Sequence, residues 1–375
     1  MLPYLGIAVA VWVVANFQSA FRLTTRRMRS VREPAPVAEL PSALATQADP
    51  KWGFGDVVIV AILVTFSALR FNVGTDYPIY LQFFRQIDPA SDWAAQIAAS
   101  PQEAGYTVLS LSIASLSDSP FAIFWATSFL TVVPIYAVLR RQSTDLPFAL
   151  VLYILFAFFL GPFNTIRQGI AVSLLFWANS WYGRSKIVFA ILSALAVLFH
   201  VSALVALALM LISKNWRPRL APVLVSVAVM IALGTAALAL PALLDVLSTL
   251  NSRYETYADD LGQAGGVGVF LLLAMRLALL VVAFRLPFPE GTVRWLAFVC
   301  VGTAFLALGT QSVVVARMDQ YFGIFLLLLL PNQLSATKNP VPAKLALIVL
   351  GAAHLILYVT NYAGLLPYET YLGVR

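Results

Sequence analysis

Residues 146–160 read Leu-Pro-Phe-Ala-Leu-Val-Leu-Tyr-Ile-Leu-Phe-Ala-Phe-Phe-Leu, and this stretch decides the fold class. A membrane-spanning strand alternates apolar and polar residues, and no such alternation is present here. A helix that is apolar on every face is buried in protein or in lipid. The stretch therefore predicts a buried helix, and similar apolar runs recur along the chain.

The composition extends this prediction to the whole chain. Of its 375 residues, 61% are hydrophobic and 11% are charged, whereas a soluble domain carries about 25% charged residues. So much apolar surface must face lipid or other helices. We therefore predict an all-α, polytopic membrane protein with roughly ten or eleven membrane segments, among which re-entrant half-helices are one of two alternatives weighed below.

Several kinds of chemistry are excluded by what the sequence lacks. The single cysteine, Cys300, lies inside an apolar run, so no disulfide framework is expected. The only histidines are His200 and His354, which argues against a His-rich metal centre. Glycine-rich nucleotide-binding motifs and an HExxH motif are absent. We expect no cofactor and no metal.

The net charge of +7 orients the chain in the membrane rather than binding nucleic acid. A first span over 2–21 is followed by a basic cluster that should stay in the cytoplasm, made of Arg22, Arg26, Arg27, Arg29 and Arg32. Residues 33–50 are rich in Pro and Ala and predict a flexible linker. We therefore divide the chain into an anchor and linker over 1–52 and a multi-helix membrane domain over 53–375.

The apolar runs of the second part predict the remaining membrane segments. They cover 56–70, 106–116, 121–139, 146–160, 164–181, 187–212, 220–240, 269–286, 295–315, 322–334 and 345–362. Residues 76–100 are too polar to span, and their aromatic residues repeat at helical spacing, which predicts an amphipathic helix at the interface. Residues 241–268 predict an external loop.

The basic clusters create a conflict in this topology. If all of them are cytoplasmic, two segments must enter and leave the membrane on one side. The candidates are the first half of 103–139 and the segment 187–212. Half-helices buried in protein would resolve the conflict. A single kinked helix through Gly161 and Pro162 is the competing solution.

Arginines gather on the outer side of this map. They are Arg70, Arg167, Arg253 and Arg317. Outside arginines run against the usual orientation bias, which calls for a reason. One reason is a bound anion, because the planar guanidinium donates two parallel hydrogen bonds to a phosphate. The alternative is that each arginine pairs with a nearby carboxylate or lipid headgroup. Arg276 lies within a span, where it either snorkels outward or lines the same site from below.

Three other residues are candidates for proton transfer. Asp76 and Glu103 flank the predicted interfacial helix, and either carboxylate could act as a general base or simply pair with an arginine. His200 lies in an otherwise apolar run, where a histidine is either a hydrogen-bonded structural residue or a titrating group. Outer tyrosines such as Tyr77 and Tyr257 could stack on sugar rings, although interfacial aromatics need no function.

Several short motifs resemble those of a known protein family and occur in the same order along the chain. Arg70-x-x-x-Gly74-Thr75-Asp76-Tyr77 resembles the first motif of the EpsG-like family of bacterial polysaccharide polymerases. Glu103-Ala-Gly-Tyr106, Asn164-Thr-Ile-Arg167-Gln168 and Phe199-His200-Val-Ser202 resemble the second, third and fourth. Arg253-Tyr-x-x-Tyr257, Arg317-x-x-x-Tyr321-Phe322 and Pro367-Tyr368 extend the similarity nearly to the end of the chain.

The resemblance implies a Wzy-like polymerase with a fold like that of C-type glycosyltransferases. Its donor and acceptor would be undecaprenyl-diphosphate-linked oligosaccharides at the periplasmic face of the bacterial cytoplasmic membrane. The product would be an exopolysaccharide, a capsule or an O-antigen. Membrane lipids and a chain-length regulator are the implied partners. A ligase that uses the same donor is the alternative. A flippase would show internal repeats and polar residues on both faces, and neither is visible.

The resemblance also implies roles for residues. Arg167 and Arg317 would stabilise the diphosphate leaving group without a metal. Asp76 would be the general base, with Glu103 and His200 as alternates. The predicted substrate contacts are Arg70, Tyr77, Asn164, Gln168, Arg253, Tyr257, Arg276 and Tyr321.

Overall fold

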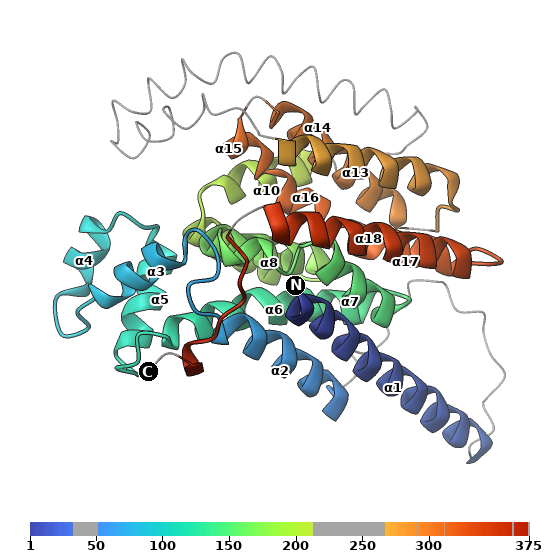
Figure 1. Cartoon of the computed structure of the whole chain (residues 1–375), viewed down its shortest axis with the longest axis horizontal. Coiled ribbons are helices and arrows are strands. Elements are labelled where there is room, and N and C mark those ends of the chain that lie inside the picture. The colour runs from blue at the N-terminus through green and yellow to red at the C-terminus, as the bar shows by residue number, and fades with distance from the viewer. Residues whose placement is uncertain (33–51, 213–266, 290, 311, 362–363, 374–375) are drawn as a thin grey trace.

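The computed structural model describes residues 1–32, 52–212, 267–289, 291–310, 312–361 and 364–373. Every regular element in these ranges is a helix (Figure 1). The α-helices are α1 Leu2–Arg32, α2 Phe54–Leu69, α3 Tyr77–Arg85, α4 Trp93–Ala99, α5 Ala104–Ala114, α6 Ala122–Gln142, α7 Leu146–Leu155, α8 Ile166–Trp181, α9 Lys186–Phe199, α10 Ser202–Ile212, α13 Val267–Arg285, α14 Thr292–Leu308, α15 Val313–Ala316, α16 Asp319–Gly323, α17 Leu326–Ser335 and α18 Val341–Asn361. Two short 3-10 helices, η1 Gly161–Phe163 and η3 Tyr371–Gly373, complete the set.

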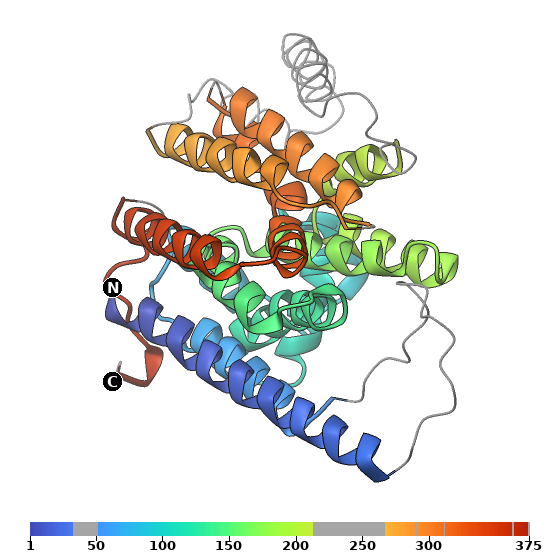
Figure 2. The same ribbon diagram turned by 90° about the vertical axis from the view of Figure 1, so that its right-hand side faces the viewer.

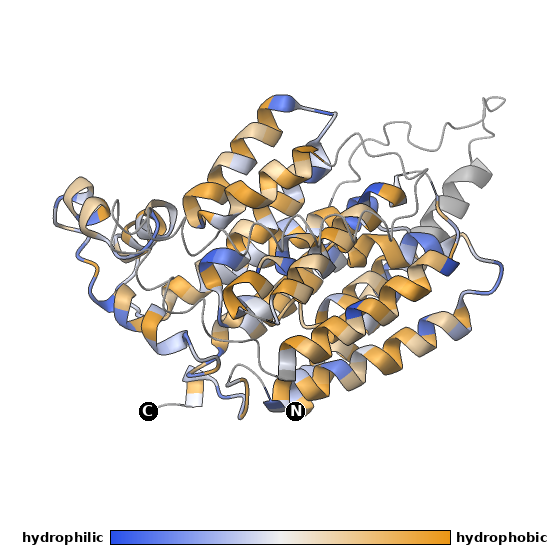
Figure 3. Cartoon of the chain, turned by 90° about the horizontal axis from the view of Figure 1, so that it is seen from above, coloured by the Kyte–Doolittle hydropathy of each residue, from blue (hydrophilic) through white to orange (hydrophobic). Residues whose placement is uncertain are grey.

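The helices confirm the prediction of an all-α, polytopic membrane protein. Within the described ranges, five helical stretches are long and apolar enough to cross a membrane, and they are Leu2–Phe21, Ala122–Gln142, Gly268–Arg285, Val313–Ser335 and Val341–Asn361. Six shorter apolar helices accompany them in the same ranges. Hydrophilic residues gather at helix ends and in connections (Figure 3). The predicted segment 220–240, most of the loop 241–268 and the linker 33–50 lie outside the described residues, so the total number of segments stays a prediction.

Helix α7, which contains most of the stretch quoted first, lies in the protein core. All its residues from Pro147 to Leu155 are buried. They pack against α1, α17 and α18. Its 10 residues extend only about 15 Å, which is too short to cross the apolar layer of a membrane. Its uniformly apolar sequence thus reflects burial among other helices rather than contact with lipid.

Helices α2 and α6 are antiparallel neighbours joined by polar contacts at both ends. The Asp56 carboxylate, at the start of α2, accepts hydrogen bonds from Tyr136 at 2.6 Å and Arg140 at 2.8 Å. Toward the other end, Ser128 Oγ donates to Ser67 Oγ at 2.8 Å. The end of α2 that carries Arg70 therefore lies beside the first half of α6, and the basic end of α6 lies at the opposite side.

The two segments that conflicted with the predicted topology are short or broken. Helix α5 has only 11 residues, and the apolar run over 187–212 is interrupted at His200, where α9 ends in an extended backbone conformation before α10 begins. The run 146–160 also does not continue as a kinked helix, because α7 stops at Leu155 and η1 lies between α7 and α8. These breaks favour the solution with half-helices.

The predicted interfacial helix over 76–100 is two helices rather than one. Helix α3 ends at Arg85 and α4 begins at Trp93, and Asp92 caps α4 by accepting from the Ala94 backbone N–H at 2.9 Å. The prediction missed this break because the aromatic spacing of α3 ends before the Asp-Pro and Ser-Asp turns of 88–92. Helices α3, α4 and α5 lie together at one side of the molecule (Figure 1).

The C-terminal strap, residues 364–373, ties the first motif to the rest of the fold. Phe71 N–H donates to the Glu369 carbonyl at 2.9 Å, and Gly74 N–H donates to the Gly364 carbonyl at 3.0 Å. At the strap's end, Tyr371 stacks on Phe121 with ring centroids 4.3 Å apart. Figures 1 and 2 agree on the layers, with α13 and α14 on one side of α17 and α18, and α1 and α2 on the other.

Candidate active site

Glu103, Arg167 and His200 meet at the ends of three helices. Glu103 is the N-cap of α5, Arg167 lies in the first turn of α8, and His200 is the C-cap of α9. The Glu103 carboxylate accepts a hydrogen bond from Arg167 Nη1 through Oε2, and its Oε1 lies 2.7 Å from His200 Nδ1. All three side chains keep between 15% and 22% of their surface exposed, so the cluster is accessible to a small part of a ligand.

The contact with Glu103 sets the chemistry of the His200 ring. A carboxylate accepts hydrogen bonds, so Nδ1 of a neutral His200 carries the hydrogen and donates it. The second nitrogen, Nε2, then presents a lone pair, and it makes no hydrogen bond to the described part of the chain. A histidine held through one nitrogen by a carboxylate, with the other nitrogen free, is arranged to accept a proton.

A glycine brings Glu103 and His200 together. A Cβ on Gly105 would lie 2.7 Å from the Leu198 carbonyl oxygen and 3.1 Å from Phe199 N. The backbone of α5 can therefore approach the last turn of α9 only because residue 105 has no side chain. The Glu103-Ala-Gly sequence thus couples the carboxylate to the closest approach of the two helices.

The start of α8 is positively charged. Its first turn contains Arg167 and Gln168 and no acidic residue, and the unpaired N–H groups of a helix N-terminus attract anions. Gln168 Nε2 donates to the Arg317 carbonyl oxygen at 2.8 Å. This bond ties the turn between α15 and α16 to the start of α8.

Arg317 contributes a cation without a carboxylate partner among the described residues. Its side chain is exposed, and it forms no ion pair with any residue in the described ranges. The charges of Arg167 and Arg317 both act on His200. Because Glu103 balances only one of the two guanidinium groups, the cluster carries one excess positive charge, which favours binding of an anion.

A second polar group lies on the loop before α3. Thr75 Oγ1 is 3.1 Å from Asp76 Oδ1 and 3.2 Å from Asn164 Oδ1, so its hydroxyl can donate to either oxygen. Gly74 adopts a φ of +105°, and a Cβ there would lie 2.8 Å from Asn164 Oδ1. The loop that carries Asp76 therefore packs directly against the residues that precede α8.

Two predicted substrate contacts lie in the core. Arg70 is 2% exposed and Tyr77 is 1% exposed. The Arg70 guanidinium donates to the Ser67 carbonyl and lies over the Phe163 and Phe124 rings, at 4.5 and 5.1 Å from their centroids. Tyr77 stacks on Phe124. Both side chains are covered by protein in this structure, and a role in contacting substrate stays a prediction.

Arg276 and Tyr321 also have internal partners. Arg276 donates two hydrogen bonds to Asp319, at 2.9 and 2.8 Å, and is 2% exposed. Tyr321 is 1% exposed, and its hydroxyl lies 3.0 Å from Ser202 Oγ, two residues after His200. In this structure these contacts join the helices around the cluster, and a role of either residue in contacting substrate stays a prediction. That Arg276 pairs with an acidic residue could have been predicted from the sequence, because a charge within a span needs a counter-charge. Which acidic residue is the partner could not have been predicted.

The remaining predicted residues, Arg253 and Tyr257, lie outside the described residues. Within the described ranges, no group of three or more His, Cys, Asp or Glu side chains is arranged to hold a metal ion. Sequence reasoning missed Gly105 and Asp319. The signal for Gly105 was its position beside the motif carboxylate of Glu103. The signal for Asp319 was that it is a single acidic residue in a long apolar run.

Comparison with known proteins gives a family match over most of the chain. A family model described as the EpsG family matches residues 56–370. No curated protein and no solved structure matches the chain. The matched range begins at Asp56 in α2 and ends at Thr370 in the C-terminal strap, so it contains both polar groups described above.

Proposed function

The chain belongs to the EpsG family, and from this membership and the geometry around His200 we propose that it polymerises lipid-linked glycans. It is a polysaccharide polymerase-like membrane protein with several candidate spans. In our proposal it is a Wzy-like glycosyltransferase that joins undecaprenyl-diphosphate-linked repeat units. The reaction takes place at the periplasmic face of the bacterial cytoplasmic membrane, in exopolysaccharide, capsule or O-antigen synthesis.

The excess positive charge around a histidine with a free Nε2 is the observation that carries this proposal. Arg317 has no carboxylate partner among the described residues, Arg167 shares Glu103 with His200, and the start of α8 adds its backbone N–H groups. A diphosphate leaving group develops negative charge, which such preorganised donors stabilise. An acceptor hydroxyl must lose a proton, which Nε2 can take.

The proposed reaction is a single displacement. The acceptor sugar hydroxyl transfers its proton to His200 Nε2 as its oxygen attacks the anomeric carbon of the donor. The bond from that carbon to the diphosphate oxygen breaks, and undecaprenyl diphosphate leaves with the electron pair, next to Arg167 and Arg317. Glu103 stabilises the imidazolium, and the anomeric configuration inverts.

This assignment changes the role that the motif implied for Asp76. We propose that His200, positioned by Glu103, is the general base, and that Asp76 and Asn164 orient sugar hydroxyl groups. Support comes from the contacts: the Asp76 carboxylate lies beside the Thr75 hydroxyl, whereas His200 has an orienting carboxylate on Nδ1. A carboxylate and an amide on a partly exposed loop suit hydrogen bonds to a sugar.

Elongation by the purified protein tests the proposal. The substrate is an undecaprenyl-diphosphate-linked repeat unit in nanodiscs, and the products are resolved by chain length with and without EDTA. We expect elongation in both conditions. Removing one oxyanion-type donor costs about 10²–10³-fold in rate. The elongation rate of Arg317→Ala should therefore fall by this factor.

Arg285→Ala is the matched control, because it removes an exposed arginine at the far end of α13. It should elongate at the wild-type rate. An Arg317→Ala variant as active as Arg285→Ala would refute the site. Loss of elongation in EDTA would refute the metal-free mechanism.

A further inference from the structure

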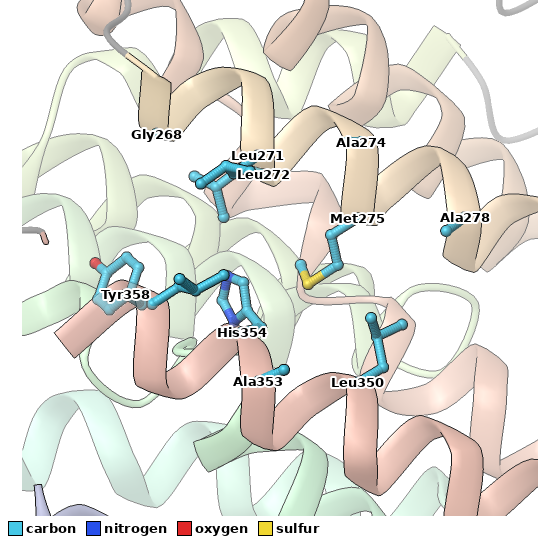
Figure 4. A pocket seen from close by; sticks show the side chains of 11 residues that line it. Gly268, Leu271, Leu272, Ala274, Met275, Ala278, Leu350, Ala353, His354 and Tyr358 are labelled. Atoms are coloured by element: carbon cyan, nitrogen blue, oxygen red, sulfur yellow. The ribbon is translucent and has the colours of Figure 1, made fainter. Parts of the chain in front are cut away.

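An apolar groove lies between α13 and α18, apart from the polar groups described above. Its volume is about 300 Å³. Leu271, Met275 and Ala278 of α13 face Leu350, Ala353 and His354 of α18 across it (Figure 4). Small side chains on both helices, such as Ala278 and Ala353, leave this space. Pockets for small ligands measure about 300–1,000 Å³, so the groove fits a short ligand segment.

The groove has a polar end and an apolar end. Tyr358 lies at the end near Gly268, His354 lies near the middle, and Ala278 and Leu350 lie at the other end (Figure 4). His354 Nδ1 donates to the Leu155 carbonyl at 3.1 Å. His354 is only 8% exposed, and its Nε2 is buried without a hydrogen-bond partner in the described part of the chain. Buried polar atoms are normally satisfied, so this nitrogen calls for a polar ligand atom.

The polar end lies toward the candidate active site. The charge of Arg317 acts on Tyr358, and the charge of Arg276 acts on His354. Arg317 is an exposed cation without a carboxylate partner in the described residues. A ligand with its polar group beside Arg317 could therefore continue past Tyr358 into the groove.

The walls of the groove are apolar surface of membrane-spanning candidates. Both Gly268–Arg285 and Val341–Asn361 belong to this set, and only 39% and 28% of their apolar windows are buried inside the protein. Leu271 and Leu357 on the rim are 42% and 44% exposed. The described part of the groove is thus open to the hydrocarbon of the bilayer, from which a lipid chain enters without crossing water.

We propose that this groove binds the isoprenoid units of the lipid carrier closest to the diphosphate, with the diphosphate at the end beside Tyr358 and Arg317. The identity of the lipid rests on the proposed function. The length, the apolar walls and the single polar end match a chain that is hydrocarbon on one side and anionic on the other.

Photocrosslinking tests this placement. The probe is a polyprenyl diphosphate without sugar that carries a diazirine in its first isoprene unit, added to the full chain in nanodiscs, and labelled peptides are mapped by mass spectrometry. We expect labels on α13 and α18. Filling the groove from either wall, by Ala353→Phe or Ala278→Phe, should reduce this labelling about tenfold, because overpacked sites reject a ligand.

Each variant has a matched control on the same helix. Val349→Phe and Val281→Phe add the same ring at positions that are 69% and 53% exposed and do not line the groove. Their labelling should equal that of the wild type. Equal labelling of a groove variant and its control, or labels that map outside α13 and α18, would overturn the proposal.

The assay also separates this inference from the proposed function. If the protein is labelled in the groove but does not elongate lipid-linked repeat units, the lipid site is supported and the polymerase proposal is refuted. If the wild-type protein elongates, and both groove variants are labelled and elongate like their controls, the polymerase proposal is supported and the lipid site is refuted.

Discussion

Arg276 and Asp319 form a bidentate ion pair within two membrane-spanning candidates. Two glycines make room for it, since a Cβ on Gly302 would meet the Asp319 carboxylate and one on Gly323 would meet the Arg276 guanidinium. Removing one partner of a buried pair leaves an uncompensated charge and costs about 3–5 kcal/mol, whereas replacing both with apolar residues is often near neutral.

We therefore expect a strong coupling between the two residues. Arg276→Leu or Asp319→Leu alone should each lower the melting temperature of the protein in detergent, and the double variant should recover most of the loss. Fluorescence-detected thermal unfolding of the four proteins measures this. Losses that simply add in the double variant would show that the pair contributes no specific stability.

His200 is the residue on which the catalytic proposal rests, and its partners come from distant parts of the sequence. Glu103 is 97 residues away, yet its carboxylate lies 2.7 Å from Nδ1. The bond selects the ring tautomer and leaves Nε2 available. A histidine in an apolar run thus gains an orienting carboxylate only through the packing of α5 on α9.

At the scale of elements, this packing depends on Gly105. Gly→Ala in a helix normally stabilises it by about 1 kcal/mol, but a Cβ here would press on the Leu198 carbonyl at 2.7 Å. Gly105→Ala should therefore separate α5 from α9, lower stability by about 1–3 kcal/mol and reduce elongation. The measurements are melting temperature and the initial rate of chain growth.

Gly6 in α1 is the control for this prediction, because a Cβ there would have nothing within 4 Å. Gly6→Ala should leave elongation unchanged and keep or raise the melting temperature. If Gly105→Ala behaved in the same way as Gly6→Ala, the close approach of the two helices would not be what holds Glu103 against His200.

At the scale of the whole molecule, the ends of several helices converge while their apolar bodies fill the core or face lipid. The starts of α5 and α8, the break between α9 and α10, and the turn between α15 and α16 supply the candidate site. Several of the shorter apolar helices therefore end at or near the polar cluster. A broken helix can expose backbone and polar groups at membrane depth only where protein surrounds them.

The polymerase proposal makes a prediction at this scale about the glycans of the cell. A strain that lacks the protein should accumulate single repeat units on the lipid carrier and lose long chains. Gel separation of lipid-linked glycans measures this, with His200→Ala complementation expected to match the deletion. Long chains that remain on the carrier in the deletion strain would instead indicate a ligase.

The class of the protein and the order of its polar residues can be predicted from local features of the chain. Apolar runs, few charges and basic clusters depend only on composition and local order, so they are enough to predict the all-α membrane fold and to order the family motifs along it. The need for half-helices was also visible, because it follows from counting charges along the chain. The break within 76–100 was not, since turn residues were interpreted as part of a helix.

The surroundings of each polar residue depend on how the helices pack. Arg70 and Arg317 look alike along the chain, but the first lies among aromatic rings and the second is exposed. Arg276 lies within a predicted span, and its partner Asp319 is known only from the fold. Arg167 and His200 share Glu103 across 64 and 97 residues. Burial and pairing depend on neighbours brought together by helix packing, and no local pattern encodes those neighbours.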